Sequence, residues 1–218
     1  MTRETVRANI AEIGIIPAVR LSSADDARFA AEVIYSSGIP IVEVTMTVPG
    51  ATAVIAQLAK QNSALIVGAG SVFDVATAQK CLDAGAAFIT TTGLDLEIVN
   101  FVHKRETVLF PGALTPGEVM AAWKAGVDFV KIFPCSQLGG APYIKALKAP
   151  FPQVPLIASG GVNQLNVADF ILAGATAVGV GAHLVPKKAI ELRQPHRIRE
   201  LSLRLANTVR ETRKQLKR

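Results

Sequence analysis

The sequence is poor in aromatic residues and in cysteine. Only 6% of the 218 residues are Phe, Tyr or Trp, whereas 50% are hydrophobic, so the core is built mainly from Ala, Val, Ile and Leu. These small and branched residues suit parallel strands that are buried on both faces, which favours an α/β fold. The two cysteines, Cys81 and Cys135, are far apart and belong to no CxxC pair. We therefore expect free thiols, with neither a disulfide framework nor a zinc site.

Long hydrophobic runs and histidine clusters are also missing. No stretch of about 18 apolar residues is free of charged or turn residues, and the first 20 residues contain no apolar segment of signal-peptide length. We therefore expect a cytoplasmic protein without a membrane partner. His103, His183 and His196 have no spacing that would place them on a common metal-binding face. Each is interpreted as a surface or packing residue, and no metal is expected.

Positive charge is concentrated at the C-terminal end of the chain. The formal net charge is +6, but residues 187–218 alone carry eleven Lys or Arg against three Glu, so residues 1–186 are slightly acidic. No aromatic stacking residues lie among these charges, which favours a solvated basic face over a nucleic-acid partner. The apolar residues of this tail recur at intervals typical of an amphipathic helix: Leu192, Ile198, Leu201, Leu205 and Val209.

Eight short apolar runs alternate with Ala-rich segments of helical length, after a leading helix at about residues 2–14. The predicted strands are 15–21, 39–46, 64–72, 88–93, 108–114, 129–134, 156–162 and 177–182. Several helices are predicted to begin after a capping residue, namely Ser23, Thr115 and Asn163. Four are predicted to end before a left-handed glycine, namely Gly38, Gly85, Gly126 and Gly174.

This repetition of strand and helix predicts one α/β domain over residues 1–218. The expected architecture is a single (β/α)8 TIM barrel at about 15–186, with an N-terminal helix and a basic C-terminal helical tail at about 187–218. An open doubly wound sheet is the alternative. The glycine-rich pieces GAGSVF and VGVGA lack the complete dinucleotide and P-loop patterns, so no cofactor is expected.

Three charged residues fall within the predicted strands, where a buried charge is costly: Arg20, Glu43 and Lys131. Strand alternation allows Glu43 and Lys131 to face the barrel interior together. A lysine flanked by Phe129 and Phe133 loses water, which favours the neutral amine that attacks carbonyl carbons. Glu43 can then move protons beside it. The alternative is a buried salt bridge between the two, kept for structural reasons.

Active sites of such barrels form at the C-terminal ends of the strands, where this chain has many polar and glycine residues. The SGG turn after the seventh strand and the Gly179–Gly181 stretch are candidate phosphate sites, because backbone N–H groups can bind an anion there. The predicted substrate-binding residues are Arg20, Thr45, Ser71, Thr91, Thr92, Phe133, Ser159, Gly160, Gly161, Gly181 and Ala182.

The segments VEVTMTVPGA, IVGAGSV, FPGALTPGEV, VKIFP, ASGGVN and VGVGAHLVP occur in an order that resembles a known family. From about residue 12 to 190 the sequence is similar to the 2-keto-3-deoxy-6-phosphogluconate (KDPG) aldolases, including bifunctional relatives that cleave 4-hydroxy-2-oxoglutarate (KHG). The resemblance implies that Lys131 forms a Schiff base and that Glu43 is the general acid/base. It also implies a metal-free homotrimer that cleaves a phosphorylated 2-oxo acid to pyruvate and D-glyceraldehyde 3-phosphate, as in the Entner–Doudoroff pathway.

The sequence departs from the family pattern at several positions of the expected site. Thr47 stands where many members have Arg, and we hypothesise that Arg20 replaces that charge. Ala182 lacks a Ser hydroxyl that could contact phosphate. Thr92 replaces a Pro and Ser136 replaces a Glu, so the sequence does not decide which sugar tail the substrate has. The galactonate epimer of the phosphorylated acid and 4-hydroxy-2-oxoglutarate share the same pyruvoyl end.

Two other functions remain open at the level of sequence. The first is a phosphate-binding barrel isomerase or epimerase, in which Glu43 is the base and Lys131 only holds a substrate anion. The second is a non-catalytic binding module, in which the basic tail recruits nucleic acid or a protein partner.

Overall fold

The computed structural model describes residues 1–216, so the last two residues of the predicted basic tail, 217 and 218, lie outside the described residues. Within this range, nine parallel strands form one sheet: β1 (Ile15–Val19), β2 (Ile41–Thr45), β3 (Ile66–Gly70), β4 (Phe88–Thr90), β5 (Val108–Phe110), β6 (Gly112–Ala113), β7 (Val130–Ile132), β8 (Leu156–Ser159) and β9 (Ala177–Val180). Each expected strand is present, and each is shorter than the apolar run that predicts it.

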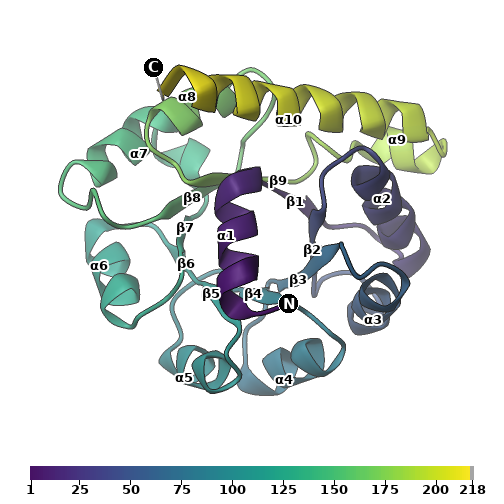
Figure 1. Cartoon of the computed structure of the whole chain (residues 1–218), viewed down its shortest axis with the longest axis horizontal. Coiled ribbons are helices and arrows are strands. Elements are labelled where there is room, and N and C mark those ends of the chain that lie inside the picture. Colours follow the sequence, from purple (N-terminus) through teal and green to yellow (C-terminus); the bar gives the residue numbers. More distant parts are fainter. Residues whose placement is uncertain (217–218) are drawn as a thin grey trace.

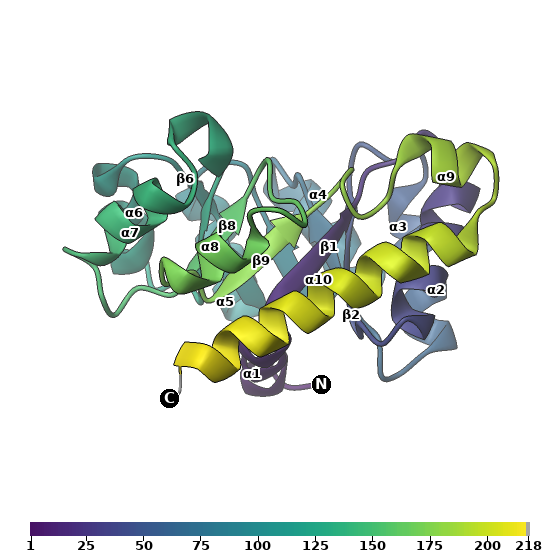
Figure 2. The same ribbon diagram turned by 90° about the horizontal axis from the view of Figure 1, so that it is seen from above.

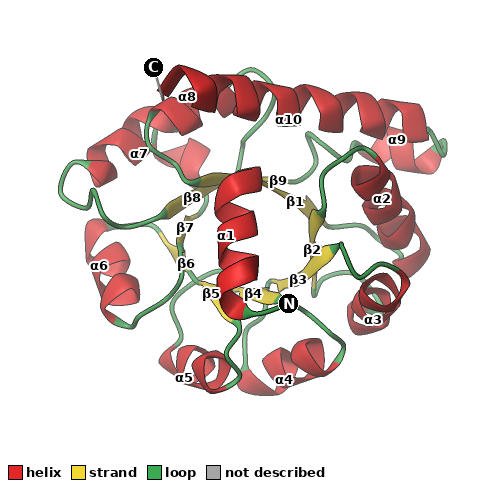
Figure 3. Ribbon diagram, in the orientation of Figure 1, coloured by secondary structure: helices red, strands yellow, loops and turns green. Residues whose placement is uncertain are grey.

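Helices surround this ring of strands (Figures 1 and 3). They are α1 (Arg3–Ile13), α2 (Ala24–Ser36), α3 (Ala51–Gln61), α4 (Val75–Asp83), α5 (Leu96–Lys104), α6 (Pro116–Lys124), the 3-10 turn η1 (Cys135–Leu138), α7 (Ala141–Lys148), α8 (Val167–Leu172), α9 (Lys187–Glu191) and α10 (Pro195–Leu216).

The barrel closes through the segment that contains β5 and β6. These two strands are halves of the single strand predicted at 108–114, separated at Pro111, which has no N–H to donate. β5 pairs with β4 and β6 pairs with β7, so one continuous segment joins both edges of the sheet. The predicted (β/α)8 TIM barrel is therefore confirmed, and the open doubly wound sheet is wrong.

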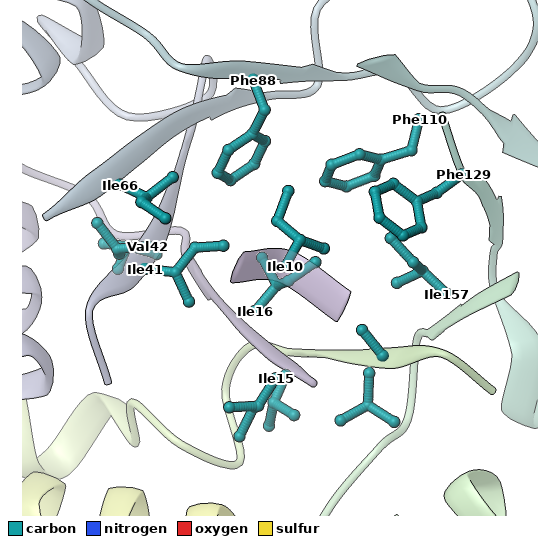
Figure 4. Packing of buried hydrophobic residues seen from close by; sticks show 14 of the residues in the cluster. Ile10, Ile15, Ile16, Ile41, Val42, Ile66, Phe88, Phe110, Phe129 and Ile157 are labelled. Atoms are coloured by element: carbon teal, nitrogen blue, oxygen red, sulfur yellow. The ribbon is translucent and has the colours of Figure 1, made fainter. Parts of the chain in front are cut away.

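Apolar side chains fill the interior at the N-terminal end of the barrel (Figure 4). Phe88 stacks on Phe110 with ring centroids 5.2 Å apart, and Phe129 meets Phe110 edge-on at 5.9 Å. Helix α1 lies across this end and places Ile10 among the interior side chains (Figures 1 and 4). Because this end is covered within residues 1–216, the open side of the barrel is at the C-terminal ends of the strands.

The predicted helix boundaries are confirmed with one exception. Ser23 and Thr115 cap α2 and α6 with their hydroxyl groups, and Thr115 forms a reciprocal capping box with Glu118. Asn163 does not cap α8, because its side chain accepts from the backbone N–H of Leu165 and holds a turn that delays the helix. The four predicted helix-ending glycines all have positive φ: Gly38, Gly85, Gly126 and Gly174.

The basic tail forms α10, which runs along the outside of the barrel against α2 and α8 (Figures 1 and 2). Its buried apolar face confirms four of the five residues predicted for it: Ile198, Leu201, Leu205 and Val209. Leu192 was wrongly included, since it is 55% exposed in the turn between α9 and α10. Within residues 1–216, no helix combines the length and the apolarity that crossing a membrane requires.

We predict that Arg213 fastens α10 to the sealed end of the barrel. Its guanidinium donates hydrogen bonds to the backbone carbonyl oxygens of Glu12 and Thr176. Replacing it in Arg213→Met should lower the free energy of unfolding in urea by about 2 kcal/mol, because hydrogen bonds from a charged donor are lost. Arg210→Met is the control, since the partners of Arg210 within residues 1–216 belong to its own helix, namely Asn207 and Glu211. An equal loss in both variants would contradict this role.

Candidate active site

A cavity of about 650 Å³ opens at the C-terminal ends of the barrel strands. The structure brings eleven of the thirteen predicted site residues to its lining: Arg20, Glu43, Ser71, Thr92, Lys131, Phe133, Ser159, Gly160, Gly161, Gly181 and Ala182. Strands that are distant in sequence supply these residues, because the ring order places their C-terminal ends around one opening. The arrangement matches the location of active sites in barrels of this kind.

Thr45 and Thr91 do not line the cavity, so the structure does not bring these two predicted residues together with the other eleven. The Thr45 hydroxyl donates to the carbonyl oxygen of Val19 at 3.2 Å and lies 2.8 Å from the Thr47 hydroxyl. The Thr91 hydroxyl donates to the carbonyl oxygen of Gly93. Both side chains are buried, and each hydroxyl uses its hydrogen for a neighbouring backbone carbonyl group.

Lys131 extends from the middle of β7 into the closed part of the cavity. Its side chain is held at 8% exposure, and its Nζ lies 5.7 Å from the centre of the Phe133 ring. Burial lowers the pKa of the Lys131 amine, and this effect outweighs the opposing attraction of the Glu43 carboxylate. The positive charge of Arg20 lowers the pKa further. Compared with a solvated lysine, the site therefore shifts the equilibrium toward the neutral, nucleophilic form of the amine.

Glu43 extends from β2 into the same space and is also 8% exposed. Gly70 on the neighbouring strand makes room for it, because a Cβ at that position would lie 2.0 Å from Glu43 Oε1. Thr90 joins the two charged groups: Lys131 Nζ donates to Thr90 Oγ1 at 3.0 Å, and Thr90 Oγ1 donates to Glu43 Oε2 at 3.2 Å. Lys131 and Glu43 form no direct ion pair within 4.0 Å in the described chain. The alternative of a structural salt bridge is therefore wrong.

Arg20 lines the cavity just after β1, and the position where the family pattern led us to expect an arginine follows the neighbouring strand β2. Its guanidinium lies 3.5 Å from the Ser71 hydroxyl, and Thr47 lines the same cavity. Ser71 has a φ of +58°, an uncommon conformation for a residue with a side chain. The strained turn after β3 thus places a hydroxyl beside the cation of Arg20.

Two turns rich in small residues form the outer wall of the cavity. Gly160 and Gly161 follow β8 with φ values of +91° and +84°, and Gly181 and Ala182 follow β9. Gly160 is required sterically as well, since a Cβ would lie 2.8 Å from the Cα of Pro134. In residues 1–216, the backbone N–H groups of Gly160, Gly161 and Ala182 donate no hydrogen bond. Unpaired N–H groups on two turns that line one cavity suit an anionic group of a ligand.

Several lining residues escaped prediction from the sequence. Lys187 was assigned to the solvated tail and His183 to the surface, yet both line the outer part of the cavity. Ser22 lines it from the segment after β1. Thr90 belongs to the buried network, and strand alternation with Phe88 could have indicated its inward direction. Among the described residues, no cluster of side chains has the composition of a metal site.

The model of the family described as KDPG and KHG aldolase matches residues 6–201. The chain belongs to this family. It is similar to the 2-dehydro-3-deoxy-phosphogluconate aldolase of Pseudomonas aeruginosa, with 29% identity over 83% of this chain and 82% of the relative. The KHG/KDPG aldolase of Escherichia coli K12 is 28% identical over 86% of this chain and 88% of the relative.

A solved KDPG aldolase from Legionella pneumophila, which holds pyruvate as a covalent carbinolamine intermediate, superposes with a TM-score of 0.85. Its sequence is 30% identical, and the match covers 91% of this chain and 97% of that one. As a member of the KDPG and KHG aldolase family, the chain is a carbon–carbon lyase. Family membership argues against both the isomerase and the non-catalytic binding module.

We predict that the pH dependence of imine formation with pyruvate reports the lowered pKa of Lys131. The rate should rise as the ammonium loses its proton, and reach half of its plateau at a pH below the ordinary lysine pKa. Arg20→Met removes a positive charge that lowers this pKa, so the half-point should move up. Glu43→Gln removes a negative charge that raises the pKa, so the half-point should move down.

The measurement is a time course of borohydride-trapped adduct at each pH, in which only the position of the half-point is compared. A wild-type half-point at the ordinary lysine pKa, or shifts of the same sign in both variants, would contradict this reading of the site.

Proposed function

We propose that this chain is a class I aldolase that cleaves 2-dehydro-3-deoxy-6-phosphogluconate to pyruvate and D-glyceraldehyde 3-phosphate. Lys131 forms the Schiff base and Glu43 is the general acid/base. The observation that carries the proposal is the buried Lys131 amine, whose pKa is lowered, at the closed end of a cavity that also contains a carboxylate. A nucleophilic lysine activated by loss of water is the requirement for imine chemistry.

The reaction follows from these two groups. The neutral Lys131 Nζ attacks the C2 ketone, and loss of water gives an iminium ion. This ion withdraws electrons from C3, so the C3–C4 bond breaks when a base takes the proton of the C4 hydroxyl. Protonation of the resulting enamine at C3 and hydrolysis then release pyruvate. Glu43 is placed to exchange protons in these steps, because its carboxylate lines the same cavity as Nζ.

The outer cavity supports a substrate with a phosphate at its far end. Gly160, Gly161 and Ala182 line this space, and within residues 1–216 their N–H groups donate no hydrogen bond. Lys187 also lines it, and its ammonium lies 3.5 Å from the Glu191 carboxylate. We propose that Arg20 supplies the cationic contact that the family pattern places at Thr47. The galactonate epimer and 4-hydroxy-2-oxoglutarate share the pyruvoyl end. The residues that line the outer part of the cavity therefore determine the selectivity among these acids.

Two further properties belong to the proposal. The resemblance supports a homotrimer as the assembly, and we propose the cytoplasm as the location. No cofactor or nucleic-acid partner is required, because Lys131 and Glu43 supply the chemistry and α10 packs against the barrel as a structural helix.

The proposed function is tested by the conservative variant Lys131→Arg. Arginine keeps the positive charge but forms no imine, so cleavage should fall by several orders of magnitude, as expected when covalent catalysis is lost. Pyruvate release is followed by a coupled assay with the phosphorylated acid as substrate. Lys145→Arg on the surface helix α7 is the matched control. Cleavage by Lys131→Arg at the wild-type rate would remove the basis of the proposal.

The variant Lys187→Met tests whether Lys187 contacts the phosphate at the far end of the substrate. We expect kcat/KM for the phosphorylated acid to fall about tenfold, the size of one lost contact to a charged group. The unphosphorylated acid should be cleaved as before. Lys188→Met is the control, since Lys188 is the adjacent exposed lysine and does not line the cavity. If both variants lose the same activity, or if Lys187→Met affects both substrates equally, Lys187 does not contact the phosphate.

A further inference from the structure

Thr90 occupies the space between the two charged groups of the site. It is the last residue of β4 and is completely buried. Around the ring, β3 separates β4 from β2, which carries Glu43. The segment with β5 and β6 separates β4 from β7, which carries Lys131. The Thr90 hydroxyl therefore contacts both groups at once: Oγ1 accepts from Lys131 Nζ at 3.0 Å and donates to Glu43 Oε2 at 3.2 Å.

We propose that Thr90 is a catalytic residue that carries protons between the Lys131 nitrogen and the Glu43 carboxylate. The proposal rests on the proposed Schiff-base function and adds a residue to it. A hydroxyl is suited to this step because it accepts one proton as it gives up another. The carboxylate cannot take the proton from Nζ directly, since no Lys131–Glu43 contact within 4.0 Å exists in the described chain.

Proton balance assigns the step at which the relay acts. Attack of the neutral amine on the ketone gives a carbinolamine with a positive nitrogen and a negative oxygen. The nitrogen passes one proton to Thr90 Oγ1 as Thr90 passes its own proton to Glu43. Glu43 then delivers that proton to the carbinolamine oxygen, and solvent supplies the second proton with which this oxygen leaves as water. An iminium ion remains on Lys131, and hydrolysis uses the same path in reverse.

Neighbouring hydroxyl groups cannot replace Thr90. Thr45 and Thr91 donate to backbone carbonyl oxygens, and the nearest polar contact of Ser71 is with Arg20. Among residues 1–216, Thr90 is the one side chain with hydrogen bonds to both Lys131 and Glu43. The path between amine and carboxylate therefore depends on a single oxygen atom.

The test compares Thr90→Val with Thr90→Ser in the full-length protein. Valine keeps the shape of threonine but removes the hydroxyl, whereas serine keeps the hydroxyl. Thr212→Val is the matched control, because Thr212 is also buried and lies on α10 away from the cavity. For each protein, the rate of imine formation at saturating pyruvate is measured by borohydride quenching, with and without added imidazole as a small proton carrier.

We expect Thr90→Val to form the imine about 100-fold more slowly, the size of a lost proton-transfer group. Added imidazole should restore part of this rate, while Thr90→Ser and Thr212→Val stay close to wild type and do not respond. A purely structural role of Thr90 would give a defect that imidazole does not relieve. The relay is overturned if Thr90→Val forms the imine at the wild-type rate, or slowly but without a response to imidazole.

These outcomes separate the relay from the function on which it rests. If the wild-type protein forms no trapped pyruvate adduct, the Schiff-base function and the relay both fail. If the wild-type protein forms the adduct and Thr90→Val forms it equally fast, only the relay fails.

Discussion

The site depends on the burial of one lysine amine away from water. Lys131 is held at 8% exposure, close to the ring of Phe133 and in the lining of the cavity. Loss of water lowers its pKa although a carboxylate lies nearby, so burial is the stronger of the two influences. A helix across the N-terminal end seals the barrel and leaves the cavity as the approach for a ligand (Figure 1).

The functional groups of the site come from different strands of the barrel. The amine comes from β7, the carboxylate from β2, and the hydroxyl that connects them from β4. Small residues set the spacing. Gly70 makes room for the Glu43 carboxylate, and within residues 1–216 the turns after β8 and β9 leave backbone N–H groups without a partner. One end of the cavity is thus built for carbonyl chemistry, and the other suits an anion.

Much of this arrangement could be predicted from the sequence because buried charges are rare. Lys131 and Glu43 stand out in strands that are otherwise apolar, and the alternation of strands with helices predicts the barrel. Strand alternation indicates which threonines face the interior, but the partners of their hydroxyls could not be predicted. Thr45 and Thr91 donate to backbone carbonyl oxygens, whereas Thr90 contacts both charged groups. Lys187 was not predicted, because in the sequence it is one of many basic residues of the tail, and nothing there indicates that it lines the cavity.

The most direct test of the central claim is to locate the nitrogen that reacts. The wild-type protein is incubated with pyruvate and borohydride, digested, and the modified peptide is sequenced by mass spectrometry. We expect a single reduced pyruvate adduct, on Lys131, because burial lowers the pKa of this lysine and its side chain lines the cavity. An adduct on another lysine, or no adduct under conditions in which the protein cleaves its substrate, would contradict the account.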